Sequence, residues 1–455
     1  RFPPMRRSPG RRAPYLVLGV SRANRIPGAT ALSPSRTIAV MDASRRMTAV
    51  DAQMLWMSAK IPNDQFLLYA FDGSPSEIDA AIDQMWLRAE ACDELRLRVV
   101  DDCAARYPRW VPGVVDRSQF VVRDAGRTWQ SCLDAVADLV GRQLDTRQMC
   151  WRVHVFPDVS GVPEAGGVAT VVVIQMAHAL GDGTRSAALA GVLLGRATPV
   201  SAPGSCRRAS LAARAIVASA EHRRMTQDLA AGLLPEPGCQ RPPLSINQPR
   251  CGEGRFRTVV MRRDQLAGPT VTVAAMVGIA GAITDYCAGR GESVTELGAE
   301  VPLASNKALA HNNFRNVGVG LHPDAEPTVR AARIMSELGR HRRRGRHPAV
   351  AAASAAFAAV PAPLLRWGVS QFDPGLRGPT LTGNTVVSSV NRGPADLAFG
   401  GCPVVFTAGF PGLSPMMSLT HGVHGIGDRV AISVNADPGN LDIDEYTDRL
   451  RAALM

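Results

Sequence analysis

Lysine is almost absent from this sequence of 455 residues, since only Lys60 and Lys307 occur among 51 basic residues. The other basic residues are arginines, and together with the abundant alanine this bias is typical of a GC-rich genome. Residues 1–40 contain eight arginines and no acidic residue, so they account for most of the net charge of +11. The rest of the chain is nearly neutral. Because nucleic-acid binding normally needs a basic face on the folded domain, we expect no nucleic-acid partner.

Several sequence motifs are also missing. The nine cysteines are scattered and form no Cys-x-x-Cys pair, which argues for a reducing cytosol and against a disulfide scaffold or a metal site. No Gly-x-Ser-x-Gly elbow occurs, which disfavours a hydrolase of that type. The phosphate-binding glycine loops are absent too, which disfavours a nucleotide-binding enzyme. The most apolar run, residues 349–365, contains Pro361 and Pro363, so we expect no membrane-spanning helix there.

The composition that remains is that of a globular chain, with 46% hydrophobic and 20% charged residues. Because an average domain has about 150 residues, the length predicts one large domain or two of medium size. Residues 1–40 hold only a short apolar stretch, too short for the core of a secretory signal. We interpret them as a disordered extension or a wrongly assigned start ahead of Met41.

Residues 41–196 alternate amphipathic helices with apolar strands. Ser76 and Asp79 predict a capping box at the start of one helix, and a second helix is expected at 131–144. Residues 168–177 (VATVVVIQMA) are almost continuously apolar and rich in β-branched side chains. This pattern predicts a strand that is covered on both faces.

Residues 197–255 contain seven prolines around one expected helix at 211–234, a composition typical of a linker that crosses between domains. Residues 256–455 resume the folded pattern, beginning with an extended segment and a helix at 272–290. Strands are expected at 316–321, 385–390 and 404–407, and a hairpin is expected between 418–423 and 429–435.

The segment His178-Ala-Leu-Gly181-Asp182-Gly183 follows the predicted buried strand and precedes a predicted helix. A histidine that leaves a core strand in a tight turn can present an oriented imidazole, the side chain best suited to accept a proton near neutral pH. Asp182 can fold back to fix the turn. Gly181 and Gly183 are expected to allow backbone conformations that other residues resist.

Two other segments share the His-x-x-x-Asp spacing but lack the glycine that follows, so the spacing alone is a weak signal. His154 precedes Asp158 and lies in a predicted strand, where we expect it to be packed and hydrogen-bonded. His424 precedes Asp428 and is expected in the hairpin loop near His421. No third ligand for a metal is evident there.

In its strand–turn–helix setting, the segment from His178 to Gly183 resembles the active-site motif of the wax ester synthase/diacylglycerol acyltransferase family. This family belongs to the superfamily of chloramphenicol acetyltransferase-like and condensation-domain enzymes. Further segments resemble the family in the same order: Met47–Leu55, Leu144–Arg147 with Trp151, Val301–Leu303 with Asn312 and Asn313, and Ser388–Pro394. The chain departs from the family at Ala177, where a first histidine is usual, and at Ala274-Ala275, where Asn-Asp is usual.

The resemblance extends over roughly residues 45–455 and implies an α/β fold. It implies two chloramphenicol acetyltransferase-like sandwich domains, residues 41–196 and 256–455, joined by the crossover linker 197–255. An active-site tunnel is then expected at the interface of the two domains.

The resemblance also implies an O-acyltransferase that moves a fatty acyl group from acyl-CoA to diacylglycerol or to a long-chain alcohol. His178 would be the general base, and Asp182 would pair with an arginine and hold the loop. Ser389 and Asn391 are candidate donors to the oxyanion. No cofactor is implied beyond acyl-CoA as co-substrate.

Two alternatives stay open: transfer to another acceptor, and a non-catalytic relative that binds acyl-CoA or lipid. The location implied is cytoplasmic, with peripheral contact at the inner face of the cell membrane or at lipid inclusions. The basic cluster Arg340–His347, next to an apolar stretch, is suited to such an anionic surface. The same cluster is equally consistent with a solvated helix end followed by a packed helix.

Overall fold

The computed structural model describes residues 44–124, 127–204, 210–249, 252–305 and 309–455. These residues fall within one compact unit, which runs from position 43 to the end of the chain. The predicted extension, residues 1–40, lies outside the described residues.

The first sheet has six strands in the order β12-β13-β2-β7-β6-β5. Its strands are β2 (Gln65–Asp72), β5 (Phe120–Val122), β6 (Trp151–Val159), β7 (Ala169–Met176), β12 (Ala398–Phe399) and β13 (Cys402–Gly409). Every residue of β7 is buried, and the strand pairs antiparallel with β2 and β6. The strand predicted at 168–177 is therefore confirmed, and its valines and isoleucine pack on both faces of the sheet.

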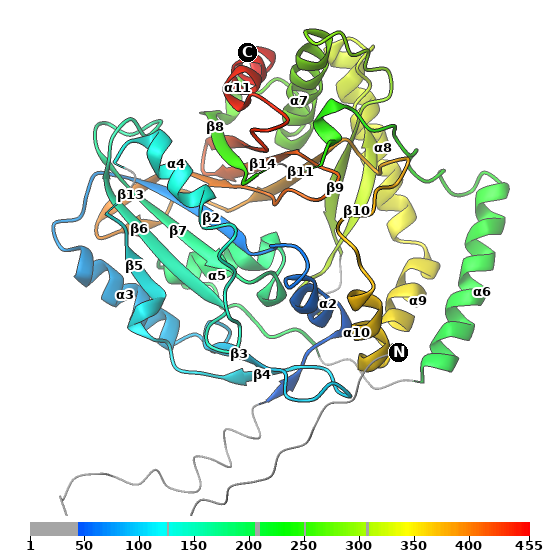
Figure 1. Cartoon of the computed structure of the whole chain (residues 1–455), viewed down its shortest axis with the longest axis horizontal. Coiled ribbons are helices and arrows are strands. Elements are labelled where there is room, and N and C mark those ends of the chain that lie inside the picture. Colours follow the sequence, from blue (N-terminus) through cyan, green and yellow to red (C-terminus); the bar gives the residue numbers. More distant parts are fainter. Residues whose placement is uncertain (1–43, 125–126, 205–209, 250–251, 306–308) are drawn as a thin grey trace, which may run out of the picture. The chain divides into compact units, whose positions relative to one another are not determined.

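Four helices pack on this sheet (Figure 1). They are α2 (Ala49–Met57), α3 (Ile78–Glu90), α4 (Trp129–Ala137) and α5 (Gly183–Leu193). Helices α2, α3 and α5 share one apolar core with the sheet, and α4 packs on the opposite face. The predicted capping box of α3 is wrong, because the residue before the helix is Glu77 and no side chain caps it. Helix α4 is shorter than predicted and is capped by Thr128.

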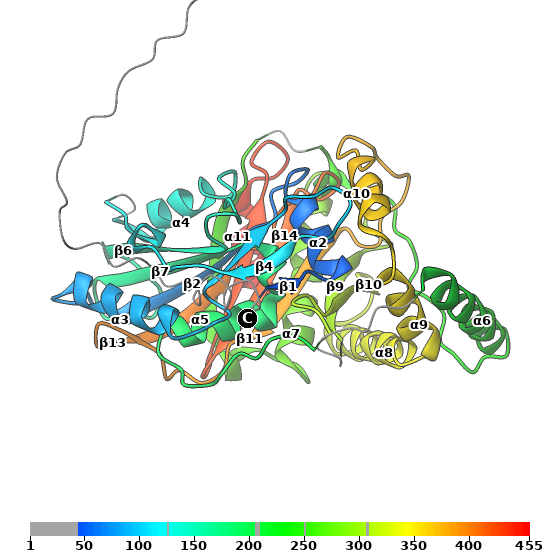
Figure 2. The ribbon, with the colours of Figure 1, turned by 90° about the horizontal axis from the view of Figure 1, so that it is seen from below.

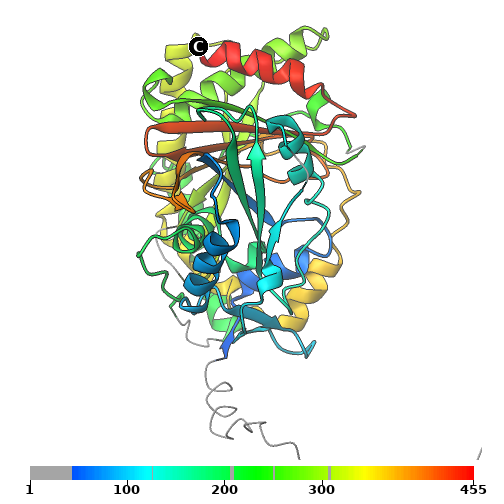
Figure 3. The ribbon, with the colours of Figure 1, turned by 90° about the vertical axis from the view of Figure 1, so that its left-hand side faces the viewer.

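The second sheet also has six strands, in the order β10-β9-β11-β14-β15-β8. Its strands are β8 (Arg255–Arg262), β9 (Gly298–Ala304), β10 (Phe314–Gly320), β11 (Thr385–Asn391), β14 (Leu419–Ile426) and β15 (Arg429–Ala436). Helices α7 (Val271–Ala288), α8 (Pro327–Gly345) and α11 (Ile443–Leu454) share its apolar core, and α7 and α11 lie side by side over it (Figure 3). The predicted hairpin is confirmed as β14 and β15, although β14 continues three residues further than expected.

The two halves of the chain interlock, because β12 and β13 come from the second half but join the first sheet through the pairing of β13 with β2. The mixed α/β fold with two helix-covered sheets agrees with the predicted class. The predicted boundaries at 196 and 255 stay predictions. A third, three-stranded antiparallel sheet contains β1 (Arg45–Arg46), β4 (Arg109–Pro112) and β3 (Leu97–Val100).

The remaining helices are α6 (Leu211–Ala230), α9 (Pro348–Phe357) and α10 (Ala362–Ser370). Helix α6 has no buried residue and lies beside α9 at the outer edge of the described structure (Figures 1 and 2). By length and composition, α7 is the one described helix that could cross a membrane, and 61% of it is buried in the fold. Helices α9 and α10 reach the same criterion only as a pair, and that pair bends by 94°.

Candidate active site

The candidate site begins where β7 ends. Ala177 N donates to Cys150 O over 2.9 Å, and the chain then forms one 3-10 turn at His178–Leu180 before it enters α5. His178 is partly exposed, whereas Ala177 and Ala179 on either side of it are buried. The histidine is therefore held at the end of a rigid core strand, with part of its ring accessible.

Asp182 is the N-cap of α5, because its Oδ1 accepts from Arg185 N over 3.0 Å. Its Oδ2 accepts from Asn313 N over 2.9 Å, and its own N donates to His311 O over 3.2 Å. Asp182 thus joins the start of α5 to residues 311–313 just before β10. No ion pair links it to an arginine among the described residues, so the partner expected for it from the resemblance is not found there.

Arg185 uses its guanidinium elsewhere, on the buried Glu94. Arg185 Nη2 lies 2.5 Å from Glu94 Oε2, and Arg45 Nη2 lies 2.6 Å from Glu94 Oε1. His311 Nε2 approaches the same carboxylate at 3.5 Å. Burial alone would raise the pKa of Glu94, but the hydrogen bond from His311 and the two guanidinium groups outweigh it and lower this pKa. Arg185 Nε also donates to Leu180 O over 3.2 Å, so this cluster of charged side chains contacts the turn that carries His178.

The imidazole of His178 has one hydrogen-bonded nitrogen. Its Nδ1 lies 3.0 Å from Asn312 Oδ1, and the ring stacks on Phe314 with 5.8 Å between the ring centroids. Asn312 Nδ2 donates in turn to Asp51 Oδ1 over 3.1 Å and to His178 O over 2.9 Å. Residues far apart in the sequence, on α2, on the turn after β7 and just before β10, therefore fix this one ring.

Burial lowers the pKa of His178 below its ordinary value of 6.5. A backbone hydrogen bond of the residue, the hydrogen bond with Asn312 and the charges of Asp182 and Asp51 act in the opposite direction. The ring is therefore neutral at pH 7 and can accept a proton there.

Gly181 and Gly183 do not have the special backbone conformation that was expected. The φ angle of Gly181 is 174°, which is extended backbone, and Gly183 is the first residue of α5. Close packing, and not backbone conformation, is the physical reason why glycine suits both positions. A Cβ atom at Gly181 would lie 3.0 Å from the side chain of Arg185, and one at Gly183 would lie 3.0 Å from Val390 Cγ2.

The contact between Gly183 and Val390 places β11 beside the start of α5, but the two candidate oxyanion donors on β11 are bonded elsewhere. Ser389 Oγ lies 2.8 Å from Thr272 Oγ1. Asn391 is exposed, and its Oδ1 accepts from Gly393 N over 3.0 Å. The structure thus joins His178 and Asp182 through residues 311–313, and it records no hydrogen bond from Ser389 or Asn391 to His178.

Asn312, Asp51 and Glu94 are site residues that the sequence did not identify as such. Asn312 and Asp51 both lie in segments that resemble the family, and this was the only available signal for them. No spacing rule connects positions 51, 178 and 312, because the fold brings them together. Among the described residues, no three His, Cys, Asp or Glu side chains are placed to share a metal ion.

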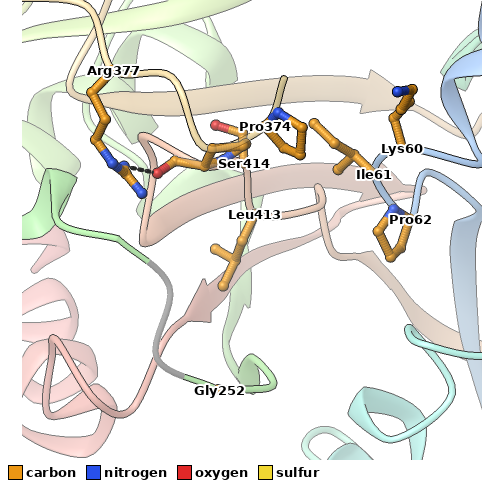
Figure 4. Close-up of a pocket in the computed structure, with 9 residues that line it drawn as sticks. Lys60, Ile61, Pro62, Gly252, Pro374, Arg377, Leu413 and Ser414 are labelled. Atoms are coloured by element: carbon orange, nitrogen blue, oxygen red, sulfur yellow. Dashed lines mark hydrogen bonds between the residues drawn. The ribbon is translucent and has the colours of Figure 1, made fainter. Parts of the chain in front are cut away.

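Two surface hollows lie away from this site. One, of about 380 Å³, lies between the loop after α2 and the loops before β11 and β14, with Lys60 and Arg377 among its lining residues (Figure 4). The other, of about 520 Å³, is lined by residues of β8, α7 and the start of α11. His178 lines neither hollow.

Comparison with known proteins identifies the C-terminal part of the chain. Residues 312–455 match the model of the WS/DGAT C-terminal domain, a match that begins at Asn312. No curated protein matches the chain. The resemblance to the wax ester synthase/diacylglycerol acyltransferase family is thus confirmed for residues 312–455.

Solved structures confirm the fold over most of the chain. The wax ester synthase/diacylglycerol acyltransferase from Marinobacter aquaeolei VT8 is similar with a TM-score of 0.59 and 17% identity, over 90% of this chain and 98% of that one. A starter condensation domain of rhizomide synthetase, solved with C8-CoA and Leu-SNAC, has a TM-score of 0.52 and 14% identity, over 92% and 94%. The first condensation domain of the CDA synthetase has a TM-score of 0.52 and 15% identity, over 90% and 95%.

Proposed function

We propose that this protein is an acyl-CoA-dependent O-acyltransferase with His178 as its general base. Its residues 312–455 match the C-terminal domain of the wax ester synthase/diacylglycerol acyltransferase family. The observation that carries this proposal is the environment of the His178 ring. One ring nitrogen is held by Asn312, the ring is partly exposed, and burial keeps its pKa below 6.5. Such an imidazole is neutral at pH 7 and has one nitrogen left to accept a proton.

In the proposed reaction, His178 Nε2 removes the proton of the acceptor hydroxyl as its oxygen attacks the thioester carbonyl of acyl-CoA. The new C–O bond gives a tetrahedral oxyanion. When this intermediate collapses, the C–S bond breaks and the imidazolium returns its proton to the departing thiolate. The products are an ester and free CoA, and no acyl-enzyme is needed. Asp182 holds the turn and residues 311–313 in place and takes no proton.

The oxyanion needs donors that are already oriented before the reaction. Ser389 and Asn391 stay our candidates, because β11 packs beside the start of α5 at Val390. Asn391 Oδ1 already accepts from Gly393 N, which leaves its Nδ2 as the group that can donate. The acyl-CoA would reach His178 through a tunnel at the interface of the two halves.

For the acceptor we propose the hydroxyl of diacylglycerol or of a long-chain alcohol, giving triacylglycerol or a wax ester. The alternatives are transfer to another acceptor and binding of acyl-CoA or lipid without turnover. Support for acyl-CoA as co-substrate comes from the family of residues 312–455 and from the related condensation domain that was solved with C8-CoA.

The test is turnover of radiolabelled palmitoyl-CoA with diacylglycerol and with hexadecanol, followed by separation of the lipid products. We expect labelled ester from the natural chain and a loss of about 10²- to 10⁴-fold in His178→Ala. His222 is an exposed histidine on α6, so His222→Ala is the matched control and should keep the full rate. Ester formed only with a different alcohol would favour another acceptor. Binding of palmitoyl-CoA without any thiol release would contradict the proposed enzymatic activity.

We also propose that the protein works in the cytoplasm, at the inner face of the membrane or at lipid inclusions, and that α10 makes the contact. Leu364 and Trp367 lie on one side of α10 with 50% and 61% of their surface exposed. The basic cluster expected at Arg340–His347 is only partly available to a membrane, because two of its side chains bond to groups of the protein itself. His341 is buried with its Nε2 2.8 Å from Gly318 O, and His347 Nε2 lies 3.1 Å from Asp228 Oδ2 on α6.

Co-flotation with phosphatidylglycerol–phosphatidylcholine vesicles tests this contact. Trp367→Asp should weaken vesicle binding about tenfold, because it removes an exposed aromatic anchor. Leu87 on α3 is also 61% exposed, so Leu87→Asp is the matched control and should bind like the natural chain. Equal loss in both variants, or in neither, would contradict a role for α10.

A further inference from the structure

Asp51 is a buried carboxylate that the proposed reaction does not use directly. It lies in the first turn of α2 and is 1% exposed. Its Oδ2 accepts from Thr48 Oγ1 over 2.8 Å and from His311 N over 3.1 Å. Its Oδ1 accepts from Asn312 N over 3.0 Å and from Asn312 Nδ2 over 3.1 Å. Four hydrogen bonds from neutral donors therefore satisfy a charge that is removed from water.

This carboxylate determines which way the amide of Asn312 points. Both groups that face Asn312 Nδ2, Asp51 Oδ1 and His178 O, can only accept hydrogen bonds. A flipped amide would place its oxygen against these two acceptors and lose both bonds. The oxygen of Asn312 must therefore be the atom that faces His178 Nδ1, at 3.0 Å.

An amide oxygen can only accept, so His178 Nδ1 must be the nitrogen that carries the proton. The lone pair then lies on Nε2. We infer that Asp51 is a positioning residue which, through Asn312, fixes His178 in the tautomer that leaves Nε2 free to act as base. This inference rests on the proposed role of His178.

The Asp51 carboxylate does more than support the start of its own helix. Thr48 is the N-cap of α2 and accepts from Asp51 N over 3.2 Å through its hydroxyl. The bonds of the Asp51 carboxylate to His311 and Asn312 connect α2 to the segment before β10. The carboxylate therefore bonds the capping hydroxyl of Thr48 and also orders the site.

Ring ¹⁵N NMR of the full chain with labelled histidine reads the tautomer directly and needs no turnover. We expect the His178 signals of the natural chain to report a protonated Nδ1 and an unprotonated Nε2. In Asp51→Asn the Asn312 amide can flip, and the signals should move toward the other tautomer. Asn312→Ala, which removes the side-chain partner of Nδ1, should do the same. Asn316 is exposed on β10, where its Nδ2 donates to Glu300 Oε1, so Asn316→Ala is the control and should keep the natural pattern.

Kinetics give a second readout. Asp51→Asn should lower kcat for ester formation about 10- to 100-fold with little change in KM, because the wrong tautomer leaves no base at Nε2. An unchanged tautomer in both Asp51→Asn and Asn312→Ala would overturn the inference. If the natural chain has no transferase activity, the proposed function fails, but the NMR pattern still tests the Asp51–Asn312–His178 arrangement.

Discussion

Three regions of this protein share the spacing His-x-x-x-Asp, yet their histidines have different environments. His178 has one nitrogen bonded to Asn312 and a partly exposed ring. His154, in β6, is 1% exposed and has both nitrogens occupied: Nδ1 accepts from Arg123, and Nε2 lies 3.1 Å from Gln175 Oε1. His154 therefore has no lone pair to offer, and the prediction of a packed, hydrogen-bonded histidine is confirmed.

His424 differs from both. It was expected in a loop, but it lies inside β14 and is 6% exposed, because the strand continues to Ile426. Burial and the neighbouring charge of Arg392 hold its pKa well below 6.5. Its neighbour His421 is fully buried between Thr385 and the hydroxyl of Tyr446. A useful base needs one held nitrogen, one free nitrogen and access to solvent, and of these rings only that of His178 combines all three.

The largest expected difference is in stability, between variants at Asp182 and at Asp428. Asp182→Ala removes the cap of α5 and leaves Asn313 N without its acceptor, so it should lower the free energy of unfolding by about 2–4 kcal/mol and reduce ester formation. Asp428 is exposed at the hairpin turn, and Asp428→Ala should change stability by no more than about 0.5 kcal/mol. Urea unfolding of both variants measures the difference. Equal stability of the two would contradict the role assigned to Asp182.

A smaller effect is expected from His154 as the pH falls. Burial lowers the pKa of His154 from 6.5 to about 4, so the unfolded chain binds a proton between these values that the folded chain does not. Below pH 6.5 the stability therefore decreases, by about 2 kcal/mol at pH 5 relative to pH 7. In His154→Gln this part of the pH dependence should vanish, whereas the exposed control His222→Ala should retain it. Urea unfolding at both pH values gives the comparison.

Much of the fold could be predicted from the sequence, because it follows from local patterns. The run of buried valines at 168–177 became β7, and the expected hairpin became β14 and β15. The capping box is a local prediction that was wrong. Ser76 and Asp79 fit a capping box by spacing, but the helix begins at Ile78 without a side-chain cap.

The site was only half predictable for a different reason. His178 and Asp182 share a turn, so their relation is visible in the sequence. Asn312 lies 134 positions from His178, and Asp51 lies 261 positions from Asn312, and only the packing of α2 and β10 around the turn joins them. Gly181 and Gly183 were predicted for the right positions but the wrong reason, because contacts with Arg185 and Val390 depend on the same long-range packing.

In the proposed reaction, the imidazole of His178 accepts the proton of the acceptor alcohol. Chemical rescue tests it most directly: the turnover of palmitoyl-CoA by His178→Gly is measured with a series of added imidazoles of increasing basicity. We expect a nearly inactive variant whose ester formation is restored in proportion to the concentration of the added base and more strongly by the more basic ones. A glycine variant that forms ester at the natural rate without any added imidazole would show that His178 is not the base.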